Sequence, residues 1–180
     1  MSKKAVRVLL VEDHVEDAQV IQEVLSDEKD VTFDVTVAQT LNQGLKALGD
    51  GKADVVLLDL KLPDSDGLDT LAKLRERVPM VPVVVLTAAN DEWMAAQALQ
   101  RGAQDYLVKG YVQVYPNLLQ RAMRYAIERK RSEETLRQDK DEISQMSSTV
   151  MDREQRILDL KREVNELLQQ AGKPPKYVVS

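Results

Sequence analysis

The sequence predicts an α/β protein built on a doubly wound parallel sheet, and three observations support this fold class. Short runs rich in β-branched residues alternate with segments of helical apolar spacing. One of these runs, Val83-Val84-Val85-Leu86, is apolar throughout, as a strand covered on both faces must be. At 180 residues and 43% hydrophobic content, the chain can bury one domain and carry an appendage, but it cannot form two full domains.

Strands and helices are predicted to alternate along the first part of the chain. The predicted strands are Val6–Val11, Phe33–Ala38, Val55–Asp59 and Val81–Thr87, with a weaker fifth strand at Tyr106–Val108. The predicted helices are Val15–Leu25, Leu41–Leu48, Leu68–Arg77 and Trp93–Arg101. This alternation implies right-handed crossovers, so a ligand site is expected at the carboxyl ends of the strands.

Local signals set the ends of two of these helices. His14, the only histidine, is expected to open the first helix. Asn90 or Asp91 is a suitable cap for the fourth helix, and Gly102 is suited to stop it.

Charge and composition exclude several classes of protein. The net charge is -5, and the first 128 residues hold 20 acidic against 14 basic side chains, which argues against a nucleic-acid surface. The absence of cysteine excludes disulfides, thiolate catalysis and sulfur-ligated metals. No apolar run approaches the roughly 20 residues that a membrane helix needs, and the N-terminus does not read as a signal peptide. We therefore expect a cytoplasmic protein that binds neither nucleic acid nor membrane.

Polar side chains follow the predicted strands where each strand ends. They are Glu12 and Asp13 after the first strand, Asp59 at the end of the third, Thr87 at the end of the fourth and Lys109 after the fifth. Taken singly, each would be an ordinary capping or surface residue. Three carboxylates at one edge repel each other unless a cation or proton intervenes, and a set of oxygen donors suits Mg²⁺. The combination predicts a divalent metal site.

These residues resemble the receiver domain of two-component response regulators. The resemblance rests on Val11-Glu12-Asp13, Leu57-Leu58-Asp59, Leu86-Thr87-Ala88 and Asp105-Tyr106-Leu107-Val108-Lys109, and it covers roughly the first 125 residues. It implies a receiver domain over residues 1–128. It also implies a flavodoxin-like fold with strand order 2-1-3-4-5.

The resemblance also implies a phosphorylation site. Asp59 would accept a phosphoryl group from the phosphohistidine of a sensor histidine kinase or phosphotransfer protein. Mg²⁺ would be held by Asp13, Asp59 and the backbone carbonyl of Lys61. Glu12 would reach the metal through water.

Further residues acquire roles from the same resemblance. Lys109 would pair with one phosphoryl oxygen and the Thr87 hydroxyl would bond another, while Tyr106 would turn inward as a switch. Taken singly, Tyr106 would be a half-buried strand aromatic, and its place before Lys109 favours the switch. The chain departs from the family at Gly110, which replaces the usual proline and predicts a looser fifth loop. Lys61 and Ala89 occupy positions that tune how water reaches the acyl phosphate.

The rest of the chain reads as one long helix with a seven-residue repeat. No glycine occurs between Tyr115 and Gly172, so the fifth helix is expected to continue into a coiled coil over residues 129–171. The a positions are Leu136, Ile143, Val150, Ile157, Val164 and Ala171, and Met146, Leu160 and Leu167 occupy d positions. This favours a parallel homodimer, although Ser132, Asp139 and Arg153 interrupt the d positions. Gly172 with Pro174 and Pro175 signals the end, and residues 172–180 are expected to be disordered or docked on a partner.

Two functions follow from these patterns. In the first, phosphorylation of Asp59 changes the fourth helix, fifth strand and fifth helix, and the coiled coil passes the signal to an unidentified downstream protein. In the second, the chain is a dimerisation or scaffold module that ignores phosphorylation. An enzyme acting on a separate substrate is not expected, and any catalysis would be phosphorylation and dephosphorylation of the chain itself.

Overall fold

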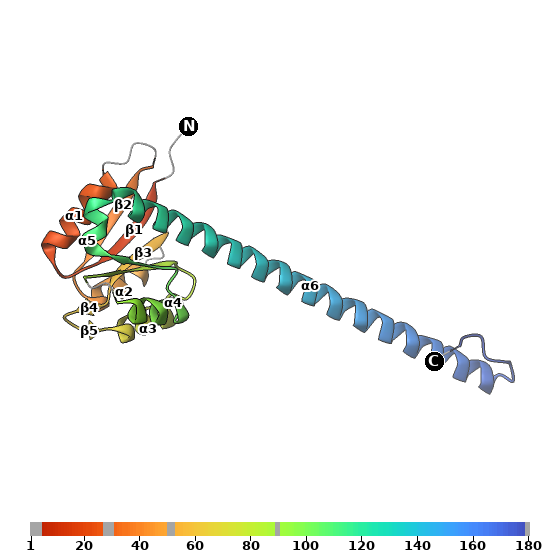
Figure 1. Ribbon diagram of the computed structural model, residues 1–180. Helices are drawn as coiled ribbons and strands as arrows, with labels where there is room; N and C mark the ends of the chain where they lie inside the picture. Colours follow the sequence, from red (N-terminus) through yellow and green to blue (C-terminus); the bar gives the residue numbers. More distant parts are fainter. Residues whose placement is uncertain (1–4, 27–30, 50–52, 89–90, 179–180) are drawn as a thin grey trace. The chain divides into compact units, whose positions relative to one another are not determined.

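The computed structural model describes residues 5–26, 31–49, 53–88 and 91–178 (Figure 1). The chain divides into two compact units, Met1–Ser132 and Glu133–Ser180. Each unit is described separately below.

The first unit contains the predicted parallel sheet. Its five strands lie in the order β2-β1-β3-β6-β7, which is the predicted order 2-1-3-4-5. The strands are β1 (Val6–Val11), β2 (Phe33–Ala38), β3 (Val55–Asp59), β6 (Val83–Thr87) and β7 (Asp105–Val108). The predicted fold class is therefore confirmed, since every neighbouring pair in this sheet is parallel.

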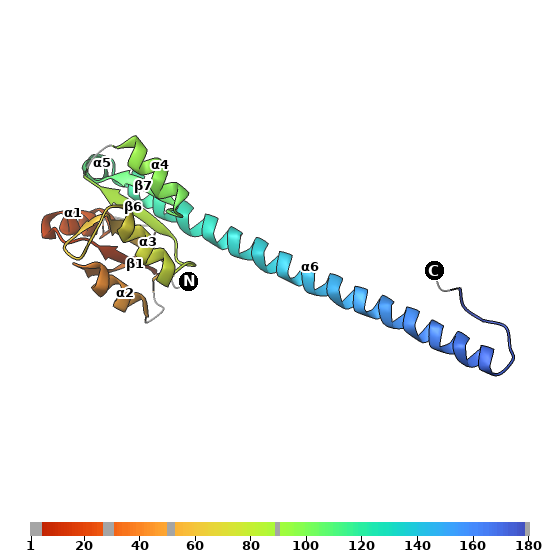
Figure 2. The same ribbon diagram turned by 90° about the horizontal axis from the view of Figure 1, so that it is seen from below.

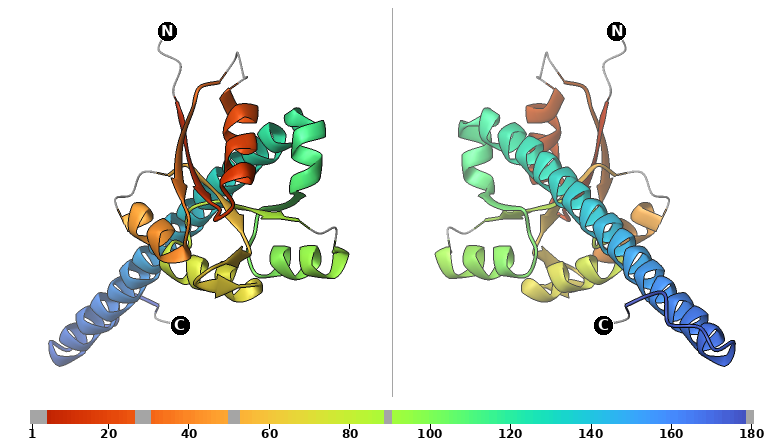
Figure 3. Two further views of the ribbon diagram at one scale, coloured as in Figure 1. Left: turned by 90° about the vertical axis from the view of Figure 1, so that its left-hand side faces the viewer. Right: turned by 90° about the vertical axis from the view of Figure 1, so that its right-hand side faces the viewer.

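Helices cover both faces of this sheet, as Figure 3 shows. On one face lie α1 (Val15–Ser26), α5 (Lys109–Val114) and the part of α6 (Pro116–Gln170) that belongs to the first unit. On the other face lie α2 (Leu41–Gly49), α3 (Leu68–Arg77) and α4 (Glu92–Gln100). Alternate residues of β1 enter the two cores, Val8 and Leu10 on one side and Leu9 and Val11 on the other. This double burial explains why the central strands read as continuous apolar runs.

The predicted helix ends agree with the observed caps. The carbonyl of His14 accepts from the Ala18 N–H at 3.0 Å, so this residue opens α1 as expected. The Asp91 side chain accepts from the Met94 N–H at 3.0 Å and caps α4. The other candidate cap, Asn90, lies outside the described residues, as does Ala89. Gly102 follows α4 with φ of +94°, a conformation that suits glycine.

Two local elements differ from the prediction. A two-stranded hairpin, β4 (Lys61–Leu62) with β5 (Ser65–Asp66), follows Asp59 and has strands too short to leave a pattern in the sequence. The short helix α5 begins at Lys109 directly after β7 and contains Gly110, and the looser fifth loop expected from this glycine stays a prediction. Among the residues that the structure describes, no peptide bond is cis.

The hairpin is tied to the neighbouring helix by one carboxylate. Asp64, in the hairpin turn, accepts from the N–H groups of Leu41 and Asn42 at 2.8 and 2.9 Å. Desolvation acts to raise the pKa of the Asp64 carboxyl, but the Asn42 and Leu41 N–H groups outweigh it and hold the pKa below its ordinary value. The turn that follows Asp59 thus caps the first turn of α2.

The second unit consists of the rest of α6 and a short tail. The helix ends at Gln170, and Gly172 takes φ of +71° while the Lys173 N–H donates to the Leu168 carbonyl at 2.8 Å, as in a Schellman motif. Ala171, a predicted a position, lies just beyond the helix. Over the described part of the chain, no helix combines the length and apolar character that crossing a membrane requires.

Apolar side chains of the predicted seam are exposed along this unit. Seven of them are between 37% and 70% exposed: Leu136, Ile143, Met146, Ile157, Leu160, Val164 and Leu167. The side chain of Val150 lies outside the described residues. The pairing of this helix with a second copy therefore stays a prediction, but the stripe that would form the pair is uncovered in the single chain.

The tail turns back onto its own helix, which Figure 2 shows. Asn165 Nδ2 donates to the Tyr177 carbonyl at 2.7 Å, and Asn165 Oδ1 accepts from the N–H groups of Lys176 and Tyr177 at 2.9 and 3.0 Å. These hydrogen bonds link Lys176 and Tyr177 to the helix, and the expected disorder or docking of residues 172–180 on a partner stays a prediction. The last two residues lie outside the described part.

Candidate functional site

Parallel pairing places the chemically active residues at one edge of the sheet. Val11 pairs with Leu58, Asp59 pairs with Leu86, and Thr87 pairs with Val108. The residues that follow these strands therefore meet at their carboxyl ends.

The Lys109 ammonium lies at the centre of this edge. Its Nζ is 2.6 Å from Glu12 Oε2, 2.7 Å from Asp59 Oδ2 and 2.9 Å from Asp17 Oδ2. The Glu12 side chain is fully buried and those of Asp59 and Lys109 are 8% and 11% exposed, whereas that of Asp17 is 43% exposed. Predicted partners from three strand ends are thus brought together, and Asp17 of α1 joins them without having been predicted.

The Asp59 carboxylate is held at both of its oxygens. Oδ1 accepts from the Lys61 N–H at 3.0 Å, and Oδ2 contacts Lys109. The residue as a whole is 5% exposed. These two contacts hold the Asp59 carboxylate in a fixed orientation at the carboxyl ends of the strands.

Burial and charge shift the pKa values of two groups. Burial raises the pKa of the Glu12 carboxyl, and the opposing attraction of Lys109 does not cancel it. Burial acts to lower the pKa of the Lys109 ammonium, but the carboxylates of Asp59, Glu12 and Asp17 outweigh it and raise the pKa above its ordinary value. Lys109 is therefore charged throughout the physiological pH range.

The acidic residues could hold a divalent cation. One ligand atom each from Glu12, Asp13, His14 and Asp59 lies within 4.8 Å of the others. Three carboxylates contact the Lys109 ammonium and Asp13 adds a fourth to the group, and the excess negative charge suits a divalent ion. The predicted ligands Glu12, Asp13 and Asp59 are brought together, and Lys61 adjoins them through its N–H. His14 was not predicted to join the set.

Thr87 and Tyr106 lie on the neighbouring strands β6 and β7. Thr87 ends β6 and pairs in register with Val108, the neighbour of Lys109. Tyr106 of β7 is half-buried and packs against the core on the face covered by α2, α3 and α4. This placement is compatible with both a switch and a strand aromatic, so the role of Tyr106 stays a prediction.

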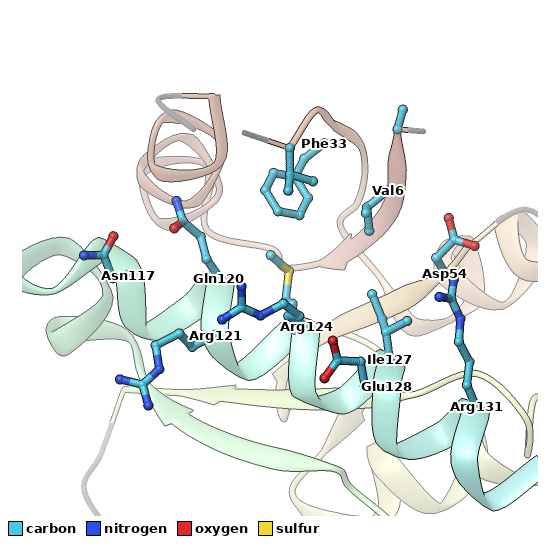
Figure 4. A pocket seen from close by; sticks show the side chains of 13 residues that line it. Val6, Phe33, Asp54, Asn117, Gln120, Arg121, Arg124, Ile127, Glu128 and Arg131 are labelled. Atoms are coloured by element: carbon cyan, nitrogen blue, oxygen red, sulfur yellow. The ribbon is translucent and has the colours of Figure 1, made fainter. Parts of the chain in front are cut away.

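A cavity of about 590 Å³ lies away from the acidic residues. Val6 and Phe33 at the starts of β1 and β2 line one side, and Arg124 and Ile127 of α6 line the other (Figure 4). Because parallel strands begin at the edge opposite to their carboxyl ends, this cavity is separate from the acidic site around Asp59.

Comparisons with known proteins identify a family that this chain matches. Residues 8–122 match the family model for the response regulator receiver domain. The chain is 35% identical over 114 residues to the probable C4-dicarboxylate response regulator DctR of Bacillus subtilis, which covers 62% of this chain and 49% of DctR. It is 38% identical over 77 residues to the regulatory protein LuxO of Vibrio cholerae, which covers 43% of this chain and 17% of LuxO.

A solved structure gives the same result. The signal receiver domain of a LuxO repressor protein from Vibrio parahaemolyticus aligns with a TM-score of 0.63 and 27% identity, over 74% of this chain and 98% of that one. The chain spans half or less of the length of the curated relatives described above.

Proposed function

Because this chain belongs to the response regulator receiver domain family, we propose that it is a phosphorylation switch in which Asp59 accepts a phosphoryl group. The observation that carries the proposal is the contact of Asp59 with Lys109 at 2.7 Å in a buried acidic site at the strand ends. The donor would be the phosphohistidine of a sensor histidine kinase or phosphotransfer protein. The family membership supports the class of reaction, and the geometry supports the residues.

Asp59 would act as the nucleophile. One of its carboxylate oxygens forms the new bond to phosphorus, and the bond between phosphorus and the donor imidazole nitrogen breaks, with the electron pair returning to the ring. The Lys61 N–H and the Lys109 ammonium fix the two oxygens of Asp59 beforehand. This preorganisation reduces the entropy cost of orienting the carboxylate for the reaction.

The same site fits a magnesium ion. Asp13, Asp59 and the Lys61 carbonyl would hold it directly and Glu12 through water, which matches the oxygen ligands that Mg²⁺ prefers. A bound Mg²⁺ would neutralise negative charge on the transferring phosphoryl oxygens. Any further catalysis would be confined to self-phosphorylation and hydrolysis of the acyl phosphate.

After transfer, the residues around Asp59 would bind the new group. Lys109 pairs with one phosphoryl oxygen and the Thr87 hydroxyl donates to another, which draws the loop after β6 inward. Tyr106 then turns toward the space that Thr87 leaves. These steps couple the acyl phosphate to α4, β7 and the start of α6.

The output would pass through α6 to a homodimer. The apolar side chains of the second unit, such as Ile143 and Leu160, form an exposed stripe of the kind that marks a surface for a partner. Their seven-residue spacing fits a second copy of the same helix. Phosphorylation would alter this pairing and thereby the binding of a downstream protein.

Molar mass with and without a phosphoryl mimic tests this proposal. Beryllium fluoride with Mg²⁺ should change the mass measured by light scattering, or its concentration dependence, for the wild type but not for Asp59→Asn. Asp69→Asn is the matched control, because Asp69 is an exposed aspartate in the first turn of α3. An Asp59→Asn chain that responds like the wild type would refute the switch.

The exposed stripe on α6 also favours a second function. The chain could be a constitutive dimerisation or scaffold module, in which the first unit takes no part in control. This reading expects the same dimer with and without Asp59 and no calorimetric heat on titration with Mg²⁺. A magnesium isotherm that disappears in Asp59→Asn would count against it.

A further inference from the structure

His14 lies beside the acidic residues and is held there by the backbone. Its Nδ1 is 3.1 Å from Asp13 Oδ1 and 3.6 Å from Glu12 Oε1, and its N–H donates to the buried Glu12 carboxylate at 3.2 Å. Its carbonyl opens α1. The backbone of His14 is therefore fixed by hydrogen bonds, while its side chain is 70% exposed and can rotate.

The ring is close enough to join a metal. Two donors on opposite sides of an ion, each about 2.1 Å from it, are separated by about 4.2 Å. The potential ligand atoms of Glu12, Asp13, His14 and Asp59 lie within 4.8 Å of one another. The spread of these four atoms is therefore within a few tenths of an ångström of the span that one ion bridges.

We propose that His14 is a nitrogen ligand that shifts this site from Mg²⁺ toward divalent transition cations such as Mn²⁺. The inference rests on the proposed function, since it requires that the acidic site binds a metal. Mg²⁺ is a hard ion that takes oxygen ligands, whereas imidazole nitrogen adds affinity for divalent first-row transition cations, least for Mn²⁺ and progressively more for Co²⁺ and Ni²⁺. One imidazole among carboxylates therefore adds affinity for the transition cations and little affinity for Mg²⁺.

A purely structural role for His14 makes a different prediction. If the residue only opens α1, then asparagine, which is also a good helix cap, should leave the binding of both ions unchanged. His14→Asn thus removes the imidazole and keeps the cap. Its urea midpoint should lie close to that of the wild type, which shows that the variant is folded.

The experiment measures metal binding directly. The full chain, without an affinity tag, is titrated with MnCl₂ and with MgCl₂ by calorimetry, and bound Mn²⁺ is studied by electron spin-echo envelope modulation. His14 is the only histidine, so imidazole nitrogen coupling can come from no other residue. We expect His14→Asn to weaken Mn²⁺ binding by about tenfold or more, to change Mg²⁺ binding less than about twofold, and to abolish the nitrogen signal.

The outcomes separate this inference from the proposed function. Suppose that both ions bind and that Asp59→Asn abolishes the binding. If the wild type and His14→Asn then have equal affinity for Mn²⁺ and neither shows nitrogen coupling, the role of His14 is refuted and the metal site stands. If neither ion binds the wild type, the metal site itself is refuted, and the role of His14 with it.

Discussion

Lys109→Met is expected to destabilise the protein through charge rather than packing. Methionine keeps most of the apolar length of the lysine stem but removes the ammonium. The buried carboxylates of Glu12 and Asp59 then face each other without a counterion. Asp17 also loses its partner, but as a half-exposed group it can be hydrated by water.

The size of the effect follows from burial. Breaking a buried ion pair costs about 3–5 kcal/mol, and a half-exposed pair such as that with Asp17 adds less than about 1 kcal/mol. A stranded glutamate can take up a proton instead, which at pH 7 costs about 3.7 kcal/mol for a group of ordinary pKa. We therefore expect the free energy of unfolding to fall by about 3 kcal/mol at pH 7.

The pH dependence has a defined sign. Without Lys109, the pKa of Glu12 rises further above its unfolded value, so the folded variant binds a proton that the unfolded chain does not. The deficit relative to wild type should therefore shrink as pH falls, to below about 1 kcal/mol near pH 4.5.

Urea unfolding at pH 7 and pH 4.5, without added metal, measures both values. Lys46→Met, at an exposed lysine of α2, is the control and should change stability by less than about 0.5 kcal/mol. A loss for Lys109→Met that is equally small, or that is the same at both pH values, would refute the electrostatic account.

Three further substitutions test other parts of the structure. Asp64→Ala removes the cap that the β4–β5 turn provides to α2 and should cost about 1 kcal/mol in urea unfolding. Because the folded pKa of Asp64 is lowered, this difference should hold above about pH 4 and vanish as pH falls through that folded value; a constant difference would exclude the carboxylate as its source. Gly102→Ala forces a side chain into positive φ and against Arg75 Nε, 3.1 Å away, so the thermal midpoint should fall by an amount equivalent to about 1–2 kcal/mol. Asn165→Ala releases three hydrogen bonds to the tail, and the Tyr177 amide should exchange its hydrogen about tenfold faster or more; unchanged exchange would show that Asn165 does not hold the tail.

The sheet could be predicted because its signals are strong and local. Short β-branched apolar runs such as Val55–Asp59 predict buried strands of a parallel sheet. Because parallel strands end at one edge of the sheet, this prediction brings Asp59 and Lys109 together. The prediction of the site depended on topology more than on any single motif. This is why residues far apart in the sequence were placed correctly.

Shorter and weaker signals were missed for physical reasons. The helix α5 holds only six residues, including Gly110 and two valines, which have low helix propensity, so no helical period could be recognised. Asp17 was not predicted, although it lies in the first turn of α1, which directly follows the strand end that carries Glu12 and Asp13. The contact of Asn165 with the tail depends on a turn after Gly172, and no sequence pattern specifies its direction.

The contacts of Lys109 also limit how many further anionic groups its ammonium can bind. The Lys109 ammonium donates hydrogen bonds to Asp17 and Asp59 and lies 2.6 Å from Glu12 Oε2, so three carboxylates surround its three N–H groups. A newly arriving anionic oxygen therefore competes with these carboxylates for the ammonium. Asp17 costs the least to displace because water can solvate it, whereas Glu12 is sealed from solvent. The loss of the contact between Lys109 and Asp17 would therefore loosen the first turn of α1, while the contact between Lys109 and the buried Glu12 remains.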